Sequence, residues 1–314
     1  MRYPFGLCDL HCDTLYEISR TGDGLVNDKY HVSFDRTDDF ASYTQVMAIW
    51  SNHRIPEEEC YTEFFERRAY LDRELARHPE IMLCRNRTEL SDAWGNGKKA
   101  VLLGVEGGRL LAGDLSRVDT LHDAGVRFLT LVWGGKSCMG GAHDVGGGLS
   151  SFGKAVLERA LALGIIPDVS HASPEIFAET AEYAKMAGKP LVATHSDSFS
   201  LREHTRNLTD AQFCTVRDAH GLVGVSLCTA HLSAEAICTV SAAADHIEHY
   251  LSLGGEKTVC LGCDLDGIET LPEGMKDIGS LSMLADELLS RNIPEDTVAD
   301  IFCNNAKQFL LDNL

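Results

Sequence analysis

The sequence has few basic residues for its length. Its 314 residues include 28 Lys and Arg against 47 Asp and Glu, a formal net charge of -19. Nucleic-acid binding needs a basic surface, so this balance argues against a nucleic-acid partner. No apolar run approaches the ~18 residues that span a membrane, and Met1-Arg2-Tyr3-Pro4 does not begin a secretory signal. We therefore expect a cytoplasmic protein with no membrane partner.

The cysteines lack the paired spacing of a disulfide framework. There are 11, an odd number, scattered through the expected strands and helices. This usage suits a reducing compartment. Cys260 and Cys263 are separated by two residues, but both lie in one apolar run with no second pair nearby. A zinc ribbon is therefore not favoured there.

One unit recurs along the chain: an apolar run, a polar or glycine-containing loop, and a segment of helical periodicity. Eight apolar runs occur, at 5–11, 44–50, 100–106, 126–132, 165–171, 191–195, 222–227 and 258–264. The helical segments between them are 57–77, 115–124, 152–163, 174–187, 210–219, 240–253 and 279–290. Ser173 and Thr209 are expected helix caps, the latter with the capping-box residue Gln212.

Eight nearly all-apolar strands alternating with helices predict an α/β fold, a (β/α)8 TIM-type barrel built on a parallel sheet. An open doubly wound sheet is the alternative. It normally has a glycine-rich phosphate turn after the first strand, whereas this chain has Asp9-Leu10-His11-Cys12-Asp13. We expect a single domain over 1–314, with a small insertion around 20–43 and a C-terminal helix outside the barrel.

Candidate metal ligands stand where the expected strands end. His11 and Asp13 are two residues apart, so in a strand both can face one metal ion. The other candidates each close a later strand: Glu106, His171, His195 and Asp264. The carboxyl ends of barrel strands converge on the face where active sites lie. We therefore expect all of these side chains to meet there in one metal-binding site.

These ligands are too many for one catalytic zinc, which takes three protein ligands and a water. They suit two metals, with His11 and Asp13 on one, His171 and His195 on the other, and Glu106 bridging both. A water between the ions would lose a proton near neutral pH and attack a carbonyl carbon or a phosphorus atom.

With these residues in place, the chain resembles the renal or membrane dipeptidase family, peptidase family M19, whose members are amidohydrolase-like, metal-dependent hydrolases. The resemblance covers nearly the whole chain. It rests on an ordered set of motifs: 9–13, Val105-Glu106-Gly107-Gly108, Leu129-Thr130-Leu131, Asp168-Val169-Ser170-His171, Ala193-Thr194-His195-Ser196, Arg206-Asn207-Leu208, and 262–267 followed by Leu271-Pro272-Glu273-Gly274-Met275.

The resemblance implies a dipeptidase that binds two Zn2+ ions per chain and hydrolyses small dipeptides through a metal-bridging hydroxide. It also implies tolerance of a D-residue at the carboxyl side. Arg206 would pair with the substrate carboxylate, as a planar guanidinium can. Asp264 would meet the substrate amine and pass a proton to the leaving nitrogen. Glu106 and Asp264 are thus the expected catalytic residues.

Two positions depart from the family pattern, and in the family both positions are near the substrate. Trp133 stands where many members have a His that polarises the substrate carbonyl, and an indole cannot act as a cationic electrophile. Lys136 or His143, in the glycine-rich loop that follows, could return a cation to the site. His231 stands where the family often has a Tyr near the substrate. Trp133 and His231 are therefore expected to contact the substrate.

The departures leave two alternatives open. One is a related metal-dependent hydrolase of another amide, lactam or ester, since the same nucleophile attacks any activated carbonyl. The other is a catalytically impaired binding protein. The sequence also leaves open which dipeptide is cleaved, which metal is loaded in the cell and whether the barrel forms a homodimer.

Overall fold

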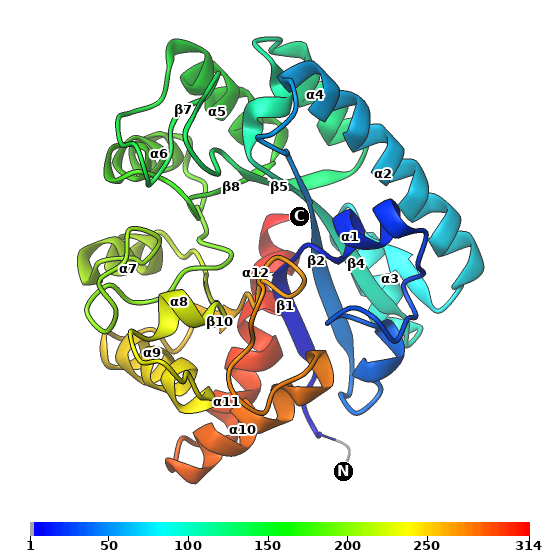
Figure 1. Ribbon diagram of the computed structural model, residues 1–314, viewed down its shortest axis with the longest axis vertical. Helices are drawn as coiled ribbons and strands as arrows, with labels where there is room; N and C mark the ends of the chain where they lie inside the picture. Colours follow the sequence, from blue (N-terminus) through cyan, green and yellow to red (C-terminus); the bar gives the residue numbers. More distant parts are fainter. Residues whose placement is uncertain (1–2) are drawn as a thin grey trace.

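The computed structural model describes residues 3–314, and in it a parallel sheet curls on itself with helices packed around it (Figure 1). Neighbouring strands follow the order β8-β5-β4-β2-β1-β10-β9. Their bounds are β1 Leu7–Cys12, β2 Tyr43–Trp50, β4 Lys99–Glu106, β5 Val126–Thr130, β8 Ile166–Asp168, β9 Val223–Val225 and β10 Val259–Leu261. The expected α/β barrel-type fold is confirmed.

The sixth expected strand, 191–195, is reduced to two bridges between the edges of this sheet. Val192 pairs with Asp168 beside β8, and Ala193 pairs with Val223 of β9. The chain then bends inward, so the carbonyl oxygen of Thr194 would lie 2.0 Å from a Cβ at Gly224 and 1.6 Å from one at Gly262. Only glycine at these two positions leaves room for this backbone. The segment completes the circuit of strands without forming a regular one.

A short strand that the periodicity did not predict, β3 Ile81–Leu83, pairs with the start of β4. A second, two-stranded sheet joins β6 Lys136–Ser137 to β7 Gly140–Gly141. Both are too short to show a period of two residues.

The helices match the expected segments closely. They are α2 Glu57–Arg77, α4 Ser116–Asp123, α5 Ser151–Leu163, α6 Pro174–Ala187, α7 Asp210–Asp218, α9 Val240–Ser252 and α10 Leu281–Ser290. The Ser173 side chain accepts a hydrogen bond from the Ile176 amide, and Thr209 forms a capping box with Gln212, so both expected caps are confirmed. Shorter helices are α1 Thr14–Thr21, α3 Arg87–Gly95 and α8 Thr229–Leu232.

The amino end of the barrel, where its strands begin, is filled by apolar side chains. Leu10, Leu102 and Phe128 belong to one buried cluster there, together with Phe309 and Leu310 from the end of the chain. The segment after Pro294 is three pieces, α11 Glu295–Ala299, a π-helical turn Asp300–Asn304 and α12 Asn305–Asn313. This segment covers the amino end of the barrel, because the π turn and α12 contact both β1 and β10.

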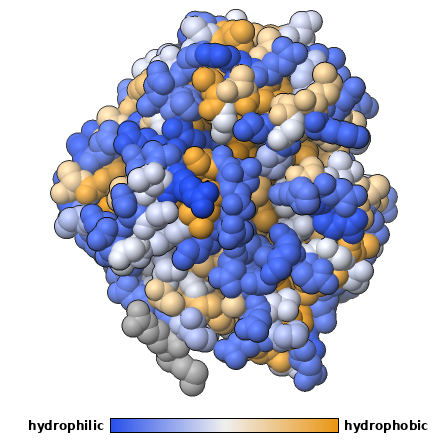
Figure 2. All heavy atoms as spheres, turned by 180° about the vertical axis from the view of Figure 1, so that it is seen from behind, coloured by the Kyte–Doolittle hydropathy of each residue, from blue (hydrophilic) through white to orange (hydrophobic). Residues whose placement is uncertain are grey.

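The segment 20–43 lies between α1 and β2 and contains one short helix, η1 Phe34–Thr37. It is tied to the barrel through Asp266, whose carboxylate accepts hydrogen bonds from the amides of His31 at 2.6 Å and Val32 at 3.2 Å. On the rear face, hydrophobic residues lie scattered among hydrophilic ones (Figure 2). Among residues 3–314 no helix is both long enough and apolar enough to cross a membrane.

Candidate metal centre

A bulge in β1 turns His11 toward the carboxyl end of the barrel, where the strands end. Asp9 pairs with Gln45 of β2 but Cys12 pairs with Met47, so three steps on β1 oppose two on β2. Leu10 therefore packs in the apolar cluster below, while the side chain of His11 faces the polar residues above it.

Asp9 holds the bulge to the neighbouring strand. Its Oδ1 accepts hydrogen bonds from the amides of Cys263 at 2.8 Å and of His11 at 3.4 Å. Burial raises the pKa of this carboxyl group to about 6, although these hydrogen bonds oppose the rise. Asp9 thus fixes the backbone of β1 against β10 beneath the candidate ligands.

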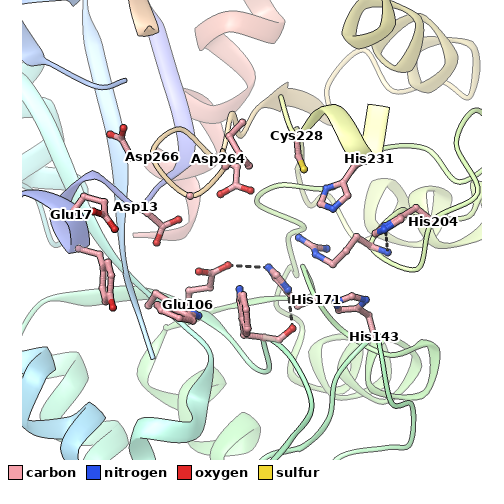
Figure 3. Close-up of a pocket in the computed structure, with 16 residues that line it drawn as sticks. Asp13, Glu17, Glu106, His143, His171, His204, Cys228, His231, Asp264 and Asp266 are labelled. Carbon is pink, nitrogen blue, oxygen red and sulfur yellow. Dashed lines mark hydrogen bonds and ion pairs between the residues drawn. The ribbon is translucent and has the colours of Figure 1, made fainter. Parts of the chain in front are cut away.

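Three imidazoles converge on one carboxylate oxygen at the centre of the site. Oε1 of Glu106 lies 2.9 Å from Nε2 of His171, 3.3 Å from Nε2 of His195 and 3.8 Å from Nε2 of His11. Nε2 of His11 is also 3.4 Å from Asp13 and 3.9 Å from Asp264. The structure therefore brings all six expected ligand or catalytic side chains together, from β1 and the residue after it, β4, the loop after β8, the segment 192–195 and the loop after β10. Figure 3 shows four of them, Asp13, Glu106, His171 and Asp264.

Hydrogen bonds fix which nitrogen of two histidines is free. Nδ1 of His171 lies 2.9 Å from the carbonyl oxygen of Trp133, which can only accept, so Nδ1 carries the proton. The Thr194 hydroxyl donates to Asp168 and therefore accepts from Nδ1 of His195 at 2.9 Å. Both Nε2 lone pairs are left facing Glu106, the arrangement of metal-ligating histidines held by an outer partner.

The protonation of these groups fits a site for cations. Burial, together with nearby Arg206, keeps the pKa of His171 well below its usual value, and burial does the same for His195, so both are neutral. Burial and the neighbouring Asp13 raise the pKa of Glu106. Burial lowers the pKa of His11, yet Glu106, Asp13 and Asp264 together bring it to about 10. The carboxylates thus attract positive charge to the position that Nε2 of His11 faces.

The donor set fits metal ions on two counts. His11 Nε2 is buried without a hydrogen-bond partner among the described residues. Two groups of three donor atoms lie within 4.8 Å of one another: His11, Glu106 and His195, and His11, Asp13 and Asp264. Imidazole nitrogens mixed with carboxylate oxygens are the ligands of catalytic zinc.

The loop backbone around the ligands is unusual. His171 and Asp264 have positive φ angles of 66° and 59°, which side-chain-bearing residues rarely adopt and which occur often at functional sites. A Cβ at Gly267 would lie 2.3 Å from an oxygen of Asp13 and 2.4 Å from one of Asp264. Glycine is therefore required where the loop after β10 passes these two carboxylates.

A cavity of about 390 Å³ opens onto the ligands, and the expected substrate residues Trp133, Arg206 and His231 all line it. Arg206 is only 5% exposed. Its Nη2 donates to the carbonyl oxygen of His195, while Nε and Nη1 are buried without a partner in the described chain. Of the two residues expected to return a cation, His143 lines the cavity, whereas Lys136 is exposed and does not.

Trp133 forms an aromatic wall in this cavity. Its ring stacks on His53 at 4.9 Å and meets Trp50 edge-on at 5.0 Å. Eight other lining residues were not predicted: Tyr16, Glu17, Trp50, His204, Cys228, Asp266, Gly267 and Ile268. Trp50 ends an expected strand, but an apolar indole at that place did not suggest a functional residue. Only Asp266 and Gly267 lay in a motif, and their role there was not assigned.

Comparisons with known proteins identify relatives of this chain. The chain is 30% identical to dipeptidase 3 of Mus musculus over 237 residues, which cover 73% of this chain and 47% of the mouse protein. For dipeptidase 3 of Homo sapiens the identity is 30%, over 66% of this chain and 44% of the human one. The chain thus spans about half the length of these mammalian relatives.

Solved structures show the same fold. A dipeptidase of peptidase family M19 superposes with a TM-score of 0.90 at 24% identity, covering 99% of both chains. A metallopeptidase from Rhodobacter sphaeroides, bound to a phosphinate mimic of the dipeptide L-Ala-D-Ala, superposes with a TM-score of 0.89 at 24% identity over 99% of both chains. The model of the membrane dipeptidase family, peptidase family M19, matches residues 3–310, and the chain belongs to that family.

Proposed function

We propose that this protein is a binuclear zinc dipeptidase. The observation that carries the proposal is the convergence of three Nε2 atoms, from His11, His171 and His195, within 3.8 Å of one oxygen of Glu106. Its relatives include proteins named dipeptidases, and a structural neighbour was solved with a dipeptide mimic. Both facts support a peptide substrate.

In this proposal His11 and Asp13 would hold one zinc, His171 and His195 would hold the other, and the carboxylate of Glu106 would be shared by both. Bound zinc ions supply Lewis acidity and a water activated as a nucleophile near neutral pH. The residues of the chain fix the site: the carbonyl of Trp133 and the hydroxyl of Thr194 orient the two histidines.

Arg206 and Asp264 orient the substrate. Nε and Nη1 of Arg206 have no partner among residues 3–314, so the guanidinium group can still bind the free carboxylate of a dipeptide. Asp264 would bind the substrate amine and would pass the proton lost by the attacking water to the leaving nitrogen. Burial raises the pKa of Asp264 to about 7, which suits a group that gains and loses a proton near neutral pH. Tolerance of a D-residue at the carboxyl side is part of the proposal.

The test is an assay of the purified protein on L,L- and L,D-dipeptides, with metal analysis before and after treatment with a chelator. We expect hydrolysis that disappears with the chelator, returns with zinc and saturates at two zinc ions per chain. Hydrolysis that survives complete metal removal would contradict the proposal.

A second candidate, hydrolysis of another amide, a lactam or an ester, is favoured by Trp133. The aromatic wall gives the cavity an apolar surface in place of the cationic donor expected from the family pattern. Zinc-dependent turnover of such compounds, without turnover of any dipeptide, would decide for this candidate.

A further inference from the structure

The cavity has two chemically different walls. Imidazoles gather on one side and carboxylates on the other (Figure 3). The first side, here called the histidine wall, consists of His143, His204, Arg206 and His231. These residues come from three separate segments: the loop after β7, the segment before α7, and α8. The opposite side carries Asp13, Glu17, Asp264 and Asp266.

Arg206 alone has enough donors for one carboxylate. Nε and Nη1 are both buried and unpaired among the described residues. Nη2 gives one of its two hydrogens to the carbonyl oxygen of His195, and its other hydrogen forms a two-donor edge with Nε or Nη1 that matches the two oxygens of one carboxylate. The carboxylate of a dipeptide main chain therefore needs no further donor from the wall. The imidazoles of the histidine wall are therefore available to bind another group of the substrate.

Two of the imidazoles offer nitrogen atoms with no partner in the described chain. Nδ1 of His204 accepts a hydrogen bond from the amide of Arg206, so the proton of a neutral His204 is on Nε2. Nδ1 of His231 is buried with no hydrogen-bond partner among residues 3–314. The two rings lie close together, with centroids 4.7 Å apart. In His143, Nδ1 is 2.8 Å from the hydroxyl of Thr205.

These imidazoles are neutral at physiological pH. Burial, followed by the charge of Arg206, lowers the pKa of His231 to about 2 and that of His143 to about 4. Burial also lowers the pKa of His204. Within residues 3–314 none of the three rings lies within ion-pair distance of a carboxylate. The wall thus combines one cation with neutral N–H donors and holds no internal anion, which suits an anionic ligand group.

We infer that the histidine wall is a specificity subsite for a second carboxylate, carried by the side chain of the C-terminal residue. The inference rests on the proposed dipeptidase function and deepens it. Dipeptides that end in Asp or Glu are the preferred class, with the main-chain carboxylate on Arg206 and the side-chain carboxylate on the N–H groups of His204 and His231.

The test compares charged substrates with neutral ones of the same shape. Ala-Asp and Ala-Asn, and Ala-Glu and Ala-Gln, differ only in a carboxylate against an amide; each pair is assayed with both L- and D-residues at the C-terminus. We expect kcat/KM to be about tenfold or more higher for the acidic member, as one hydrogen bond to a charged group provides. A ratio at or below one for every pair would overturn the inference.

Variants locate the preference. The double variant His204→Phe with His231→Phe keeps two aromatic rings but removes their N–H donors. We expect its acid-to-amide ratio to fall toward one, mainly through a higher KM for the acidic substrate, with zinc content and melting temperature held as checks on folding. His78→Phe, at the end of α2 and outside the cavity lining, is the matched control and should keep the wild-type ratio. An unchanged ratio in the double variant would overturn the inference.

A binding measurement separates this inference from the proposed function. If no dipeptide is hydrolysed, the proposed function fails, and calorimetry on the zinc-loaded protein with glutamate and glutamine still decides the subsite. We expect glutamate to bind about tenfold or more tightly than glutamine, and the double variant to lose this difference. Equal affinities in the wild-type protein would overturn the inference.

Discussion

The two ends of the barrel are built from the same strands but from opposite kinds of residue. On β4, Leu102 packs in the apolar cluster at the amino end, and Glu106 lies among three imidazoles at the carboxyl end. The amino end is packed against α12, whereas the carboxyl end opens into the cavity that holds the candidate ligands and has buried donors with no partner in the described part of the chain. Stability and chemistry are thus separated along each strand, as in other barrels whose active sites lie at the carboxyl ends.

Glu106→Gln tests the carboxyl end most severely. The amide keeps the size of the side chain but cannot place a negative charge between two cations, so we expect hydrolysis to be abolished and bound zinc to fall. Because burial and Asp13 raise the pKa of Glu106, its charged form is unfavourable in the metal-free protein, so replacing it with a neutral amide should not decrease the free energy of unfolding. Kinetics, metal analysis and denaturant unfolding check this. A variant that retains wild-type zinc content and turnover would show that Glu106 is not a bridging ligand.

Leu310→Ala tests the opposite end. Leu310 is fully buried in the cluster that α12 closes, so we expect the free energy of unfolding to fall by about 2–5 kcal/mol. The activity per folded molecule should be retained, since no residue of α12 lines the cavity. Urea unfolding and kinetics below the melting temperature measure the two effects. A large loss of kcat in the folded variant would contradict the separation of the two ends.

Thr194→Val tests a residue that supports the candidate ligands from below, between the amino and carboxyl ends of the barrel. The change keeps the shape of the side chain but removes the hydroxyl that links Asp168 to Nδ1 of His195. We expect zinc affinity to fall by about 10–100-fold, the usual effect of losing an outer partner of a ligating histidine. Competition with a chelator measures the affinity. Thr194→Ser keeps the hydroxyl and should bind zinc as the wild type does; equal losses in both variants would assign the effect to packing.

Periodicity predicted most of the fold because most elements are long enough to show it. The segments 57–77 and 174–187 are helices with those bounds, and seven of the eight expected strands are present. The remaining one, the sixth expected strand at 191–195, has the apolar composition of a strand, but its backbone turns into the barrel at Thr194. The amino-acid composition of 191–195 does not predict such a turn. The turn requires glycine at positions 224 and 262, because any larger residue there would collide with the carbonyl oxygen of Thr194.

The convergence of the candidate ligands was predictable to the extent that these residues stand at strand ends. The reason given for His11 and Asp13 was incomplete, because β1 ends at Cys12 and a bulge, rather than plain alternation, turns His11 toward the site. The sequence could not tell which residues of a loop lie in the site. Lys136 and His143 belong to the same glycine-rich segment, yet of these two only His143 lines the cavity.

The sequence by itself determined which chemical groups are available: apolar runs long enough for strands, and a His or carboxylate at the end of each important one. Only the tertiary structure decided how those groups meet. The hydrogen bonds of Nδ1 leave Nε2 as the free nitrogen of His171 and His195. The loops place carboxylates on one wall of the cavity and imidazoles on the other. The reason is that strand spacing is set by local backbone geometry, whereas loop conformation depends on contacts with residues far away in the chain.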